Sequence, residues 1–243
     1  MSMKILNTAM VLLGTTSLMV GCNFDQPETE CFVQESEYWM AKYDLVDTPT
    51  RTAGGTCDDV APIGELIGVY KYFNPETGTG QLAIRPDGLA ALASDDDTTD
   101  QSEQTAIGSL NLEQDEQDFC NAAAFNAARV FEADAAGGAA NEIIYEFSNV
   151  RVYSAPSAPG TQLTGELRYT NKGCVSTYVV RALWPAVGCD PEAAEPARNC
   201  GAGSGLNPDF ATTCSVGSSC YEAHGDDELT GCCVPSKPIP SFK

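Results

Sequence analysis

The sequence predicts an all-β protein, an antiparallel meander that forms a sandwich or barrel, with a disulfide-rich irregular C-terminal tail. Runs of β-branched and aromatic residues fill residues 61–188, and clusters of Gly, Pro, Asn and Asp separate these runs. The disulfide-rich tail is predicted from composition, because residues 189–243 contain six of the 11 cysteines but few large apolar side chains.

The first half of the meander has strand patterns on both sides of a clear turn signal. Residues 65–73 are rich in Val, Ile, Tyr and Phe, and residues 81–85 alternate between apolar and polar. Pro86-Asp87-Gly88 predicts a turn, because proline fixes φ and glycine accepts a positive φ. We therefore expect residues 89–93 to form the returning strand and residues 107–112 to form another short strand.

The second half of the meander has longer alternating runs. We expect residues 141–154 to form one long strand or a bent pair, and the change of parity at Ser148-Asn149 predicts a bulge. Residues 162–170 and 175–184 alternate on either side of Asn171-Lys172-Gly173, so the sequence predicts a hairpin there.

Two further segments are less regular. The alanines of residues 119–134 favour helix, whereas Val130-Phe131-Glu132 favours strand, and both assignments stay open. Residues 94–104 are acidic and predict a solvated polar loop. This loop is also a weak calcium candidate, because calcium takes roughly six to eight oxygen ligands, but the regular spacing of known calcium loops is absent. Its candidate ligands are Asp95, Asp96, Asp97, Asp100 and Glu103.

The N-terminus has the pattern of an export signal. Lys4 supplies a positive charge, and residues 9–20 form an uncharged, largely apolar run that is shorter than the roughly 20 residues a membrane-spanning helix needs. The run ends in Leu18-Met19-Val20-Gly21-Cys22, and the chain then turns polar and acidic. This segment resembles the lipobox of bacterial lipoproteins, with methionine at position 19 where leucine is usual.

That resemblance implies a lipid anchor. Residues 1–21 would be removed as a signal peptide, the Cys22 thiol would receive diacylglycerol, and the new amine would be acylated, so fatty acids such as palmitate are expected there. Two or more acyl chains hold a protein stably to a membrane, whereas one binds only marginally. Asn23 replaces the aspartate that retains such proteins in the inner membrane of enteric bacteria. We therefore expect an exported protein anchored in the outer membrane, facing the periplasm or the surface; a cleaved signal with Cys22 in a disulfide is the alternative.

The remaining ten cysteines are expected to form disulfides, because the export signal directs the chain to an oxidising compartment. They form two even sets, and we expect each set to pair within itself, although the sequence does not choose the pairs. A shared disulfide through Cys189 is the rival interpretation. No metal site is expected, because the cysteines lack the spacing of zinc ligands. The first set is Cys31, Cys57, Cys120 and Cys174, and the tail set is Cys189, Cys200, Cys214, Cys220, Cys232 and Cys233.

These patterns divide the chain into four parts. We expect residues 22–60 to be a tether and cap, in which the aromatic cluster of Tyr38, Trp39 and Tyr43 packs on the core; a sugar-stacking platform is the alternative. The parts are a lipoprotein signal peptide (1–21), the tether and cap (22–60), an antiparallel β domain (61–188) and a cysteine-rich tail (189–243).

Charge and motifs restrict the function. The chain has 34 acidic and 13 basic residues, a formal net charge of −21, which argues against a nucleic-acid partner. The single histidine, His224, lies in a cysteine-rich loop. A nucleophile elbow has glycines two residues to either side of its serine, and Ala202 and Leu206 hold those positions around Ser204. No nucleotide-binding glycine motif occurs, so we expect no catalytic residue and no cofactor.

A second resemblance covers roughly the last hundred residues. The segments that carry it are Asn149–Tyr153, Pro159–Gln162, Gly173-Cys174, Leu183–Cys189 and Gly203–Phe210. They resemble predicted lipoproteins of myxobacteria and related lineages, a group with no assigned activity, so the resemblance implies an envelope lipoprotein and no active site. We predict a lipid-anchored lipoprotein with a non-enzymatic binding or structural role. Its expected partners are the membrane, through the anchor, and an envelope protein or polysaccharide. The alternative is an Asp/Glu-dependent hydrolase of envelope or extracellular polymers, which two facing carboxylates would serve.

Overall fold

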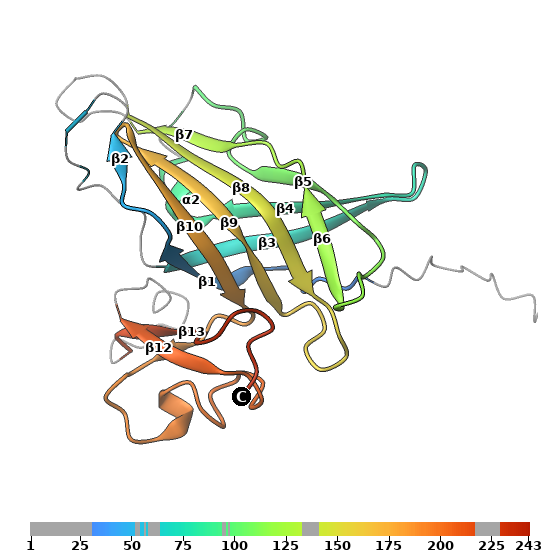
Figure 1. Ribbon diagram of the computed structural model, residues 1–243, viewed down its shortest axis with the longest axis vertical. Helices are drawn as coiled ribbons and strands as arrows, with labels where there is room; N and C mark the ends of the chain where they lie inside the picture. Colours follow the sequence, from blue (N-terminus) through green and yellow to red (C-terminus); the bar gives the residue numbers. More distant parts are fainter. Residues whose placement is uncertain are drawn as a thin grey trace, which may run out of the picture.

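Alternation of apolar and polar residues produces one large antiparallel sheet (Figure 1). The computed structural model describes residues 31–51, 54–55, 57, 64–93, 96, 98–132, 141–216 and 229–243. Within these ranges the main sheet has ten strands in the order β1-β3-β4-β5-β6-β8-β9-β10-β2, and β7 pairs with β8. The strands are β1 (Ser36–Leu45), β2 (Thr50–Arg51), β3 (Gly64–Asn74), β4 (Thr79–Pro86), β5 (Ala106–Leu110), β6 (Phe119–Ala123), β7 (Ala128–Glu132), β8 (Asn141–Tyr153), β9 (Gln162–Asn171) and β10 (Cys174–Leu183).

The sheet closes on itself, because β1 pairs with β3 on one side and with β10 on the other. Closure removes the free edges of these strands and encloses one apolar core. Trp39, Ile67, Leu82, Leu163 and other inward side chains fill that core and are fully buried. The prediction of an all-β antiparallel meander is confirmed.

Two local predictions in β8–β10 are confirmed. Only two residues, Lys172 and Gly173, lie between the paired positions Asn171 and Cys174, and both have positive φ (48° and 72°), as a tight hairpin turn requires. In β8 the register with β9 shifts between Ser148 and Arg151, and Asn149 has a φ of 50°. The parity change in the sequence therefore marks a real bulge.

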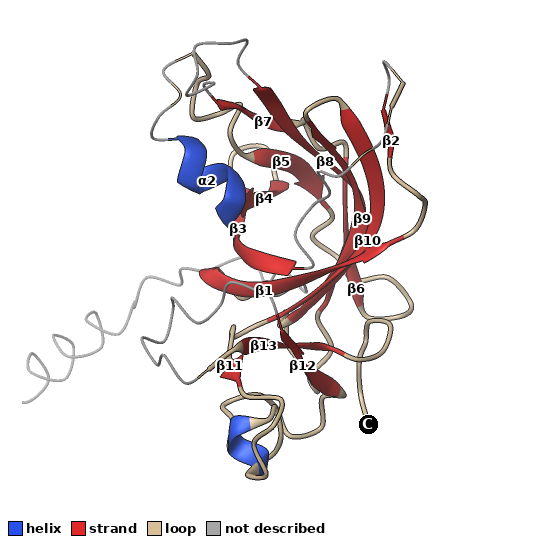
Figure 2. Ribbon diagram, turned by 90° about the vertical axis from the view of Figure 1, so that its left-hand side faces the viewer, coloured by secondary structure: helices blue, strands red, loops and turns tan. Residues whose placement is uncertain are grey.

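The expectation of a strand at residues 89–93 is wrong. Pro86 ends β4, and the chain enters a short helix, α2 (Asp87–Ala93). Its alanines favour helix, Asp87 lies in the first turn where negative charge is stabilising, and Leu89 is fully buried in the core. The helix covers one open end of the barrel beside β3, β4 and β7 (Figure 2).

The expected tether and cap also differs from the structure. Residues 36–45 form β1, which takes part in the barrel instead of covering it. The reason is the alternation within the aromatic cluster: Trp39 and Tyr43 point inward and are buried, whereas Tyr38 is 47% exposed. The open choice at residues 119–134 is settled for the described residues as two strands, β6 and β7, which pair with successive parts of β8.

The C-terminal tail carries a second, three-stranded sheet in the order β11-β13-β12. Its strands are β11 (Gly188–Cys189), β12 (Thr212–Val216) and β13 (Gly231–Pro235), and a 3-10 turn, η1 (Pro196–Arg198), lies between the first two along the chain. In Figure 2 this sheet lies below β1, on the side of the barrel away from α2.

Four disulfides have both cysteines among the described residues, and each joins a pair within one of the two cysteine sets. The barrel set forms Cys31–Cys120 and Cys57–Cys174, and the tail set forms Cys189–Cys214 and Cys200–Cys233. Cys232 is disulfide-bonded as well, and Cys220 lies outside the described residues. The Sγ atoms of Cys189, Cys200 and Cys233 lie within 4.8 Å of one another, but all three are used in disulfides.

None of these four disulfides links the barrel to the tail, but apolar side chains of the two parts pack together. Met40 and Leu66, on the outer face of the barrel, cluster with Ala186, three residues after β10, and with Cys232 and Val234 of the tail. Phe210 and Phe242 form edge-to-face pairs with each other and, through Phe242, with Tyr153 of β8. The tail is therefore packed against the barrel through apolar side chains.

Candidate functional site

The lipidation candidate Cys22 lies outside the described residues, but the chain that follows it limits where the body can sit. Cys31 is the first described residue, and its disulfide to Cys120 fixes it to the barrel. A fully extended chain spans at most about 3.5 Å per residue, so the nine steps from Cys22 to Cys31 reach no further than about 30 Å. A lipid on Cys22 would hold the barrel close to the membrane surface.

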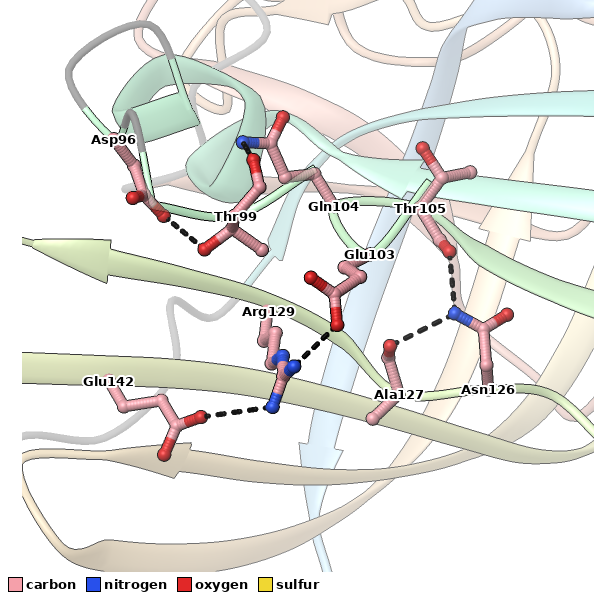
Figure 3. Close-up of polar contacts among 9 residues, drawn as sticks. All are labelled: Asp96, Thr99, Glu103, Gln104, Thr105, Asn126, Ala127, Arg129 and Glu142. Atoms are coloured by element: carbon pink, nitrogen blue, oxygen red, sulfur yellow. Dashed lines mark hydrogen bonds and ion pairs between the residues drawn. The ribbon is translucent and has the colours of Figure 1, made fainter. Parts of the chain in front are cut away.

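The structure uses Asp96, one of the calcium candidates, to organise its own loop (Figure 3). The carboxylate accepts hydrogen bonds from the Thr98 and Thr99 side chains and from the main-chain N–H groups of Thr98 and Phe131. Burial acts to raise the pKa of Asp96, but these donors outweigh it and hold the pKa below the usual value. Asp95 and Asp97 lie outside the described residues.

The other two described calcium candidates, Glu103 and Asp100, make different contacts. Glu103 pairs with Arg129, which also lies 3.9 Å from Glu142 (Figure 3). Asp100 contributes its main-chain oxygen to a turn, where it accepts from the N–H groups of Glu103 and Gln104. Among the described residues, no three carboxylates come together as metal ligands would. The calcium hypothesis stays a prediction that rests on the sequence.

Glu65, on β3, is a buried carboxylate that the sequence analysis did not single out. Its Oε1 accepts hydrogen bonds from the hydroxyls of Tyr43 (2.9 Å) and Tyr145 (3.0 Å). Its Oε2 accepts a hydrogen bond from the main-chain N–H of Gly88 (2.7 Å), at the start of α2. Glu65 thereby links β1, β8 and the helix that covers the end of the barrel.

Burial dominates the electrostatics of this cluster. It raises the pKa of Glu65 to about 7, even though the three donors favour the ionised form. Burial, and then the Glu65 charge, raise the pKa values of Tyr43 and Tyr145. Glu65 is only 2% exposed, so it has no access to a polymeric substrate and serves the interior of the barrel. Its position on the same strand face as Ile67 and Val69 was the sequence signal that it points inward.

The outer face of β1, β3 and β4 carries a separate group of side chains, which we call the tyrosine face: Tyr38, Tyr70, Tyr72 and Arg85. Tyr70 pairs with Ala83 and Tyr72 pairs with Gln81 across the two strands, and Arg85 lies opposite Gly68. Tyr38 and Tyr72 are about half exposed. Burial is the largest cause that raises the pKa of Tyr70, and the charges of nearby Glu37 and Tyr72 raise it further. Tyr38 also lies near Tyr70.

Gly68 opens a hollow in this face. Its φ does not require glycine, but a Cβ there would lie 3.2 Å from Cε2 of Tyr70, so the ring rests over the space that a side chain would fill. The hollow has a volume of about 380 Å³ and is bordered by Glu37, Tyr70, Arg85 and Asp87.

A second hollow, of about 400 Å³, is also bordered by Arg85. Its border includes Tyr72, Gln81, Gln101 and Thr105. Arg85 borders both hollows, so the two lie side by side along the tyrosine face, and we call them together the track.

A third hollow, of about 620 Å³, lies beside the β3–β4 hairpin and residues 109–115, and its Asp115 side chain is already paired. Asp115 accepts hydrogen bonds from Asn121 and Arg151, and from the main-chain N–H groups of Gln117 and Phe119. These contacts hold the turn between β5 and β6, which accounts for the polar residues there.

The comparisons with known proteins support a lipoprotein, the class that the sequence predicts. The chain belongs to the MlpA family, because the MlpA family model matches residues 37–185, most of the barrel. One relative, "Putative lipoprotein MlpA" of Myxococcus xanthus, is 55% identical over 243 residues, which is 100% of both chains. The likeness to myxobacterial lipoproteins thus extends over the whole chain and beyond its last hundred residues.

No solved structure matches the chain at a significant level. In the described part of the chain, no helix has the length and apolar character needed to cross a membrane.

Proposed function

We propose that the protein is a lipid-anchored lipoprotein of the cell envelope with a non-enzymatic binding role. The observation that carries the proposal is Gly21-Cys22 after an aliphatic run, in a family whose named member is a lipoprotein. The acyl chains on Cys22 supply the membrane attachment, the barrel supplies a rigid body, and the tyrosine face supplies the contact surface. Asn23 supports the outer membrane as the site of the anchor.

Substitution of Cys22 tests the anchor. Cys22→Ala removes the thiol that receives diacylglycerol, so the chain should remain unprocessed and lack acyl groups. Membranes washed with carbonate and dissolved in detergent, followed by mass analysis of the chain, would separate the two forms. The matched control is Ser17→Ala, in the same signal but outside the lipobox, which should be processed normally. A Cys22→Ala chain that is processed and bound as the parent is would contradict the proposal.

One observation favours the hydrolase alternative, and it concerns the hollow below Tyr70. Glu37 and Asp87 both border this hollow, so it brings two carboxylates next to an aromatic ring at the surface. The test is release of reducing ends from envelope polysaccharide by the purified protein and by the Glu37→Gln/Asp87→Asn double variant. Release that depends on this pair would establish the hydrolase, and no release from either protein would leave the binding role.

A further inference from the structure

In the part of the chain that the structure describes, Arg85 stands apart from the other basic side chains because it has no hydrogen-bond or ion-pair partner. Its Nε is buried and has no hydrogen-bond partner, and no ion pair joins its guanidinium to a carboxylate of the described residues. Such an orphaned donor is unusual, because buried polar groups are almost always satisfied. It is the more unusual in a chain with 34 acidic residues. Carboxylates pair with Lys42, Arg129, Arg151, Arg168 and Arg181, and main-chain oxygens accept from Lys71, Lys237 and Lys243.

The surroundings of Arg85 have the chemistry of a sugar-binding surface. Tyr70 and Tyr72 stand two residues apart on one strand face, roughly 7 Å along the strand, so they present neighbouring rings. Gln81, Gln101 and Thr105 border the same track and offer amide and hydroxyl groups. Aromatic rings that pack on the apolar faces of sugars, beside donors and acceptors for hydroxyls, suit a chain of sugar units.

We propose that the tyrosine face binds an acidic polysaccharide, with Tyr70 and Tyr72 against successive sugar rings and Arg85 paired to the carboxylate of a uronic acid unit. This proposal rests on the proposed binding role and names its ligand class. An arginine matches a carboxylate in a bidentate geometry, and such charge-assisted pairs are about twice as strong as neutral hydrogen bonds.

The local charges set where the acidic group would lie. Glu37 and Asp87 border the first hollow, where they repel a carboxylate but accept hydrogen bonds from sugar hydroxyls. The second hollow has Arg85 as its charged side chain, so a carboxylate fits on that side. The net charge of −21 opposes binding of a polyanion. Salt screens charges beyond about 8 Å at physiological ionic strength, so the charged groups close to the ligand determine whether it binds.

The test is binding of defined glycans to the full-length lipoprotein in detergent micelles. The probes are immobilised oligosaccharides of galacturonate, glucuronate and mannuronate, each beside the same chain with its carboxylates reduced to alcohols. We expect retention on at least one uronate chain, weakened about tenfold or more by carboxyl reduction, because a hydrogen bond to a charged group is lost. Retention on none of the uronate chains, or equal retention on the reduced chains, would overturn the proposal.

Three variants locate the site. Arg85→Gln should weaken retention about tenfold or more and remove the difference between acidic and reduced chains. Tyr72→Ala should weaken retention of both kinds, whereas Tyr72→Phe keeps the ring and should bind as the parent. Gly68→Val fills the hollow under Tyr70 without removing a polar group, and it should also weaken binding.

Matched controls separate the site from general effects. Arg168→Gln removes an arginine on β9 that is paired with Glu146, and Phe32→Ala removes a half-exposed ring outside the tyrosine face. Both should bind as the parent; equal losses in Arg85→Gln and Arg168→Gln would overturn the assignment to Arg85. The anchor is scored independently by the Cys22→Ala fractionation, so loss of membrane attachment and loss of glycan binding are distinguishable.

Discussion

The buried Glu65 carboxylate should make the stability of the barrel depend on pH. In the unfolded chain the group titrates near its usual pKa of 4.5, whereas burial raises the pKa in the folded protein to about 7. Between these two values the folded protein keeps the proton and the unfolded chain has lost it, so the free energy of unfolding falls as pH rises. Below pH 4.5 and above about pH 7, Glu65 does not make the free energy of unfolding depend on pH.

The size of the effect follows from the two pKa values. A difference of one pKa unit corresponds to about 1.4 kcal/mol, so the rise from 4.5 to about 7 makes the folded protein about 3 kcal/mol less stable above pH 7 than below pH 4.5. Glu65→Gln removes the ionisation and therefore this slope. In the variant the amide oxygen can accept from the Gly88 N–H and the NH₂ can donate to the tyrosine hydroxyls, so any further change in stability should be small and the same at every pH.

Urea unfolding of the oxidised chain without residues 1–22, at pH values from 4 to 8, measures both effects. The expected result is that the stability difference between the parent and Glu65→Gln changes by about 3 kcal/mol across this range, with the parent losing stability as pH rises. The matched control is Glu116→Gln, an exposed residue, whose stability should follow the parent. A parent and a Glu65→Gln variant with parallel pH profiles would refute the reasoning.

Three other predictions test the packing and the anchor. Removing the barrel disulfide in Cys31→Ala/Cys120→Ala, with a sequence separation of 89, should lower the free energy of unfolding by about 4 kcal/mol in urea titrations, and an unchanged midpoint would contradict the role of this link. Phe210→Ala removes the ring that packs on Phe242 and should cost about 3 kcal/mol. Limited proteolysis should then cleave the tail before the barrel, whereas an unchanged cleavage pattern would show that the tail does not depend on this contact. Asn23→Asp should shift the lipoprotein toward inner-membrane fractions on a sucrose gradient, and an unshifted distribution would mean that another signal sorts it.

The strand pattern was predictable wherever alternation was strong, as in β8, β9 and β10, because one face of each of these strands is buried. Helix α2 was not predictable in the same way. The short run Leu89–Ala93 fits either a strand or a helix, and the decision comes from Leu89 entering the open end of the barrel. The position of β1 in the sheet was also not predictable, because it pairs with both β3 and the much later strand β10.

The candidate site was less predictable than the fold. The parity of Glu65 with Ile67 and Val69 indicated an inward carboxylate, but its partners Tyr43 and Tyr145 lie 22 and 80 residues away. The tyrosine face depends on the register between β3 and β4, and Arg85 is distinguished by an Nε that has no hydrogen-bond partner among the described residues. A sequence does not show whether a side chain lacks a partner, so the unpaired Nε of Arg85 becomes visible only in the folded chain.

The most direct test of the account is the mass of the N-terminal peptide of the mature protein, isolated from native membranes. The account predicts a chain that begins at Cys22 and carries diacylglycerol on the thiol and a further acyl group on the amine. A mature chain with an unmodified Cys22, or with Cys22 in a disulfide, would contradict the lipid anchor and with it the proposed place of this protein in the envelope.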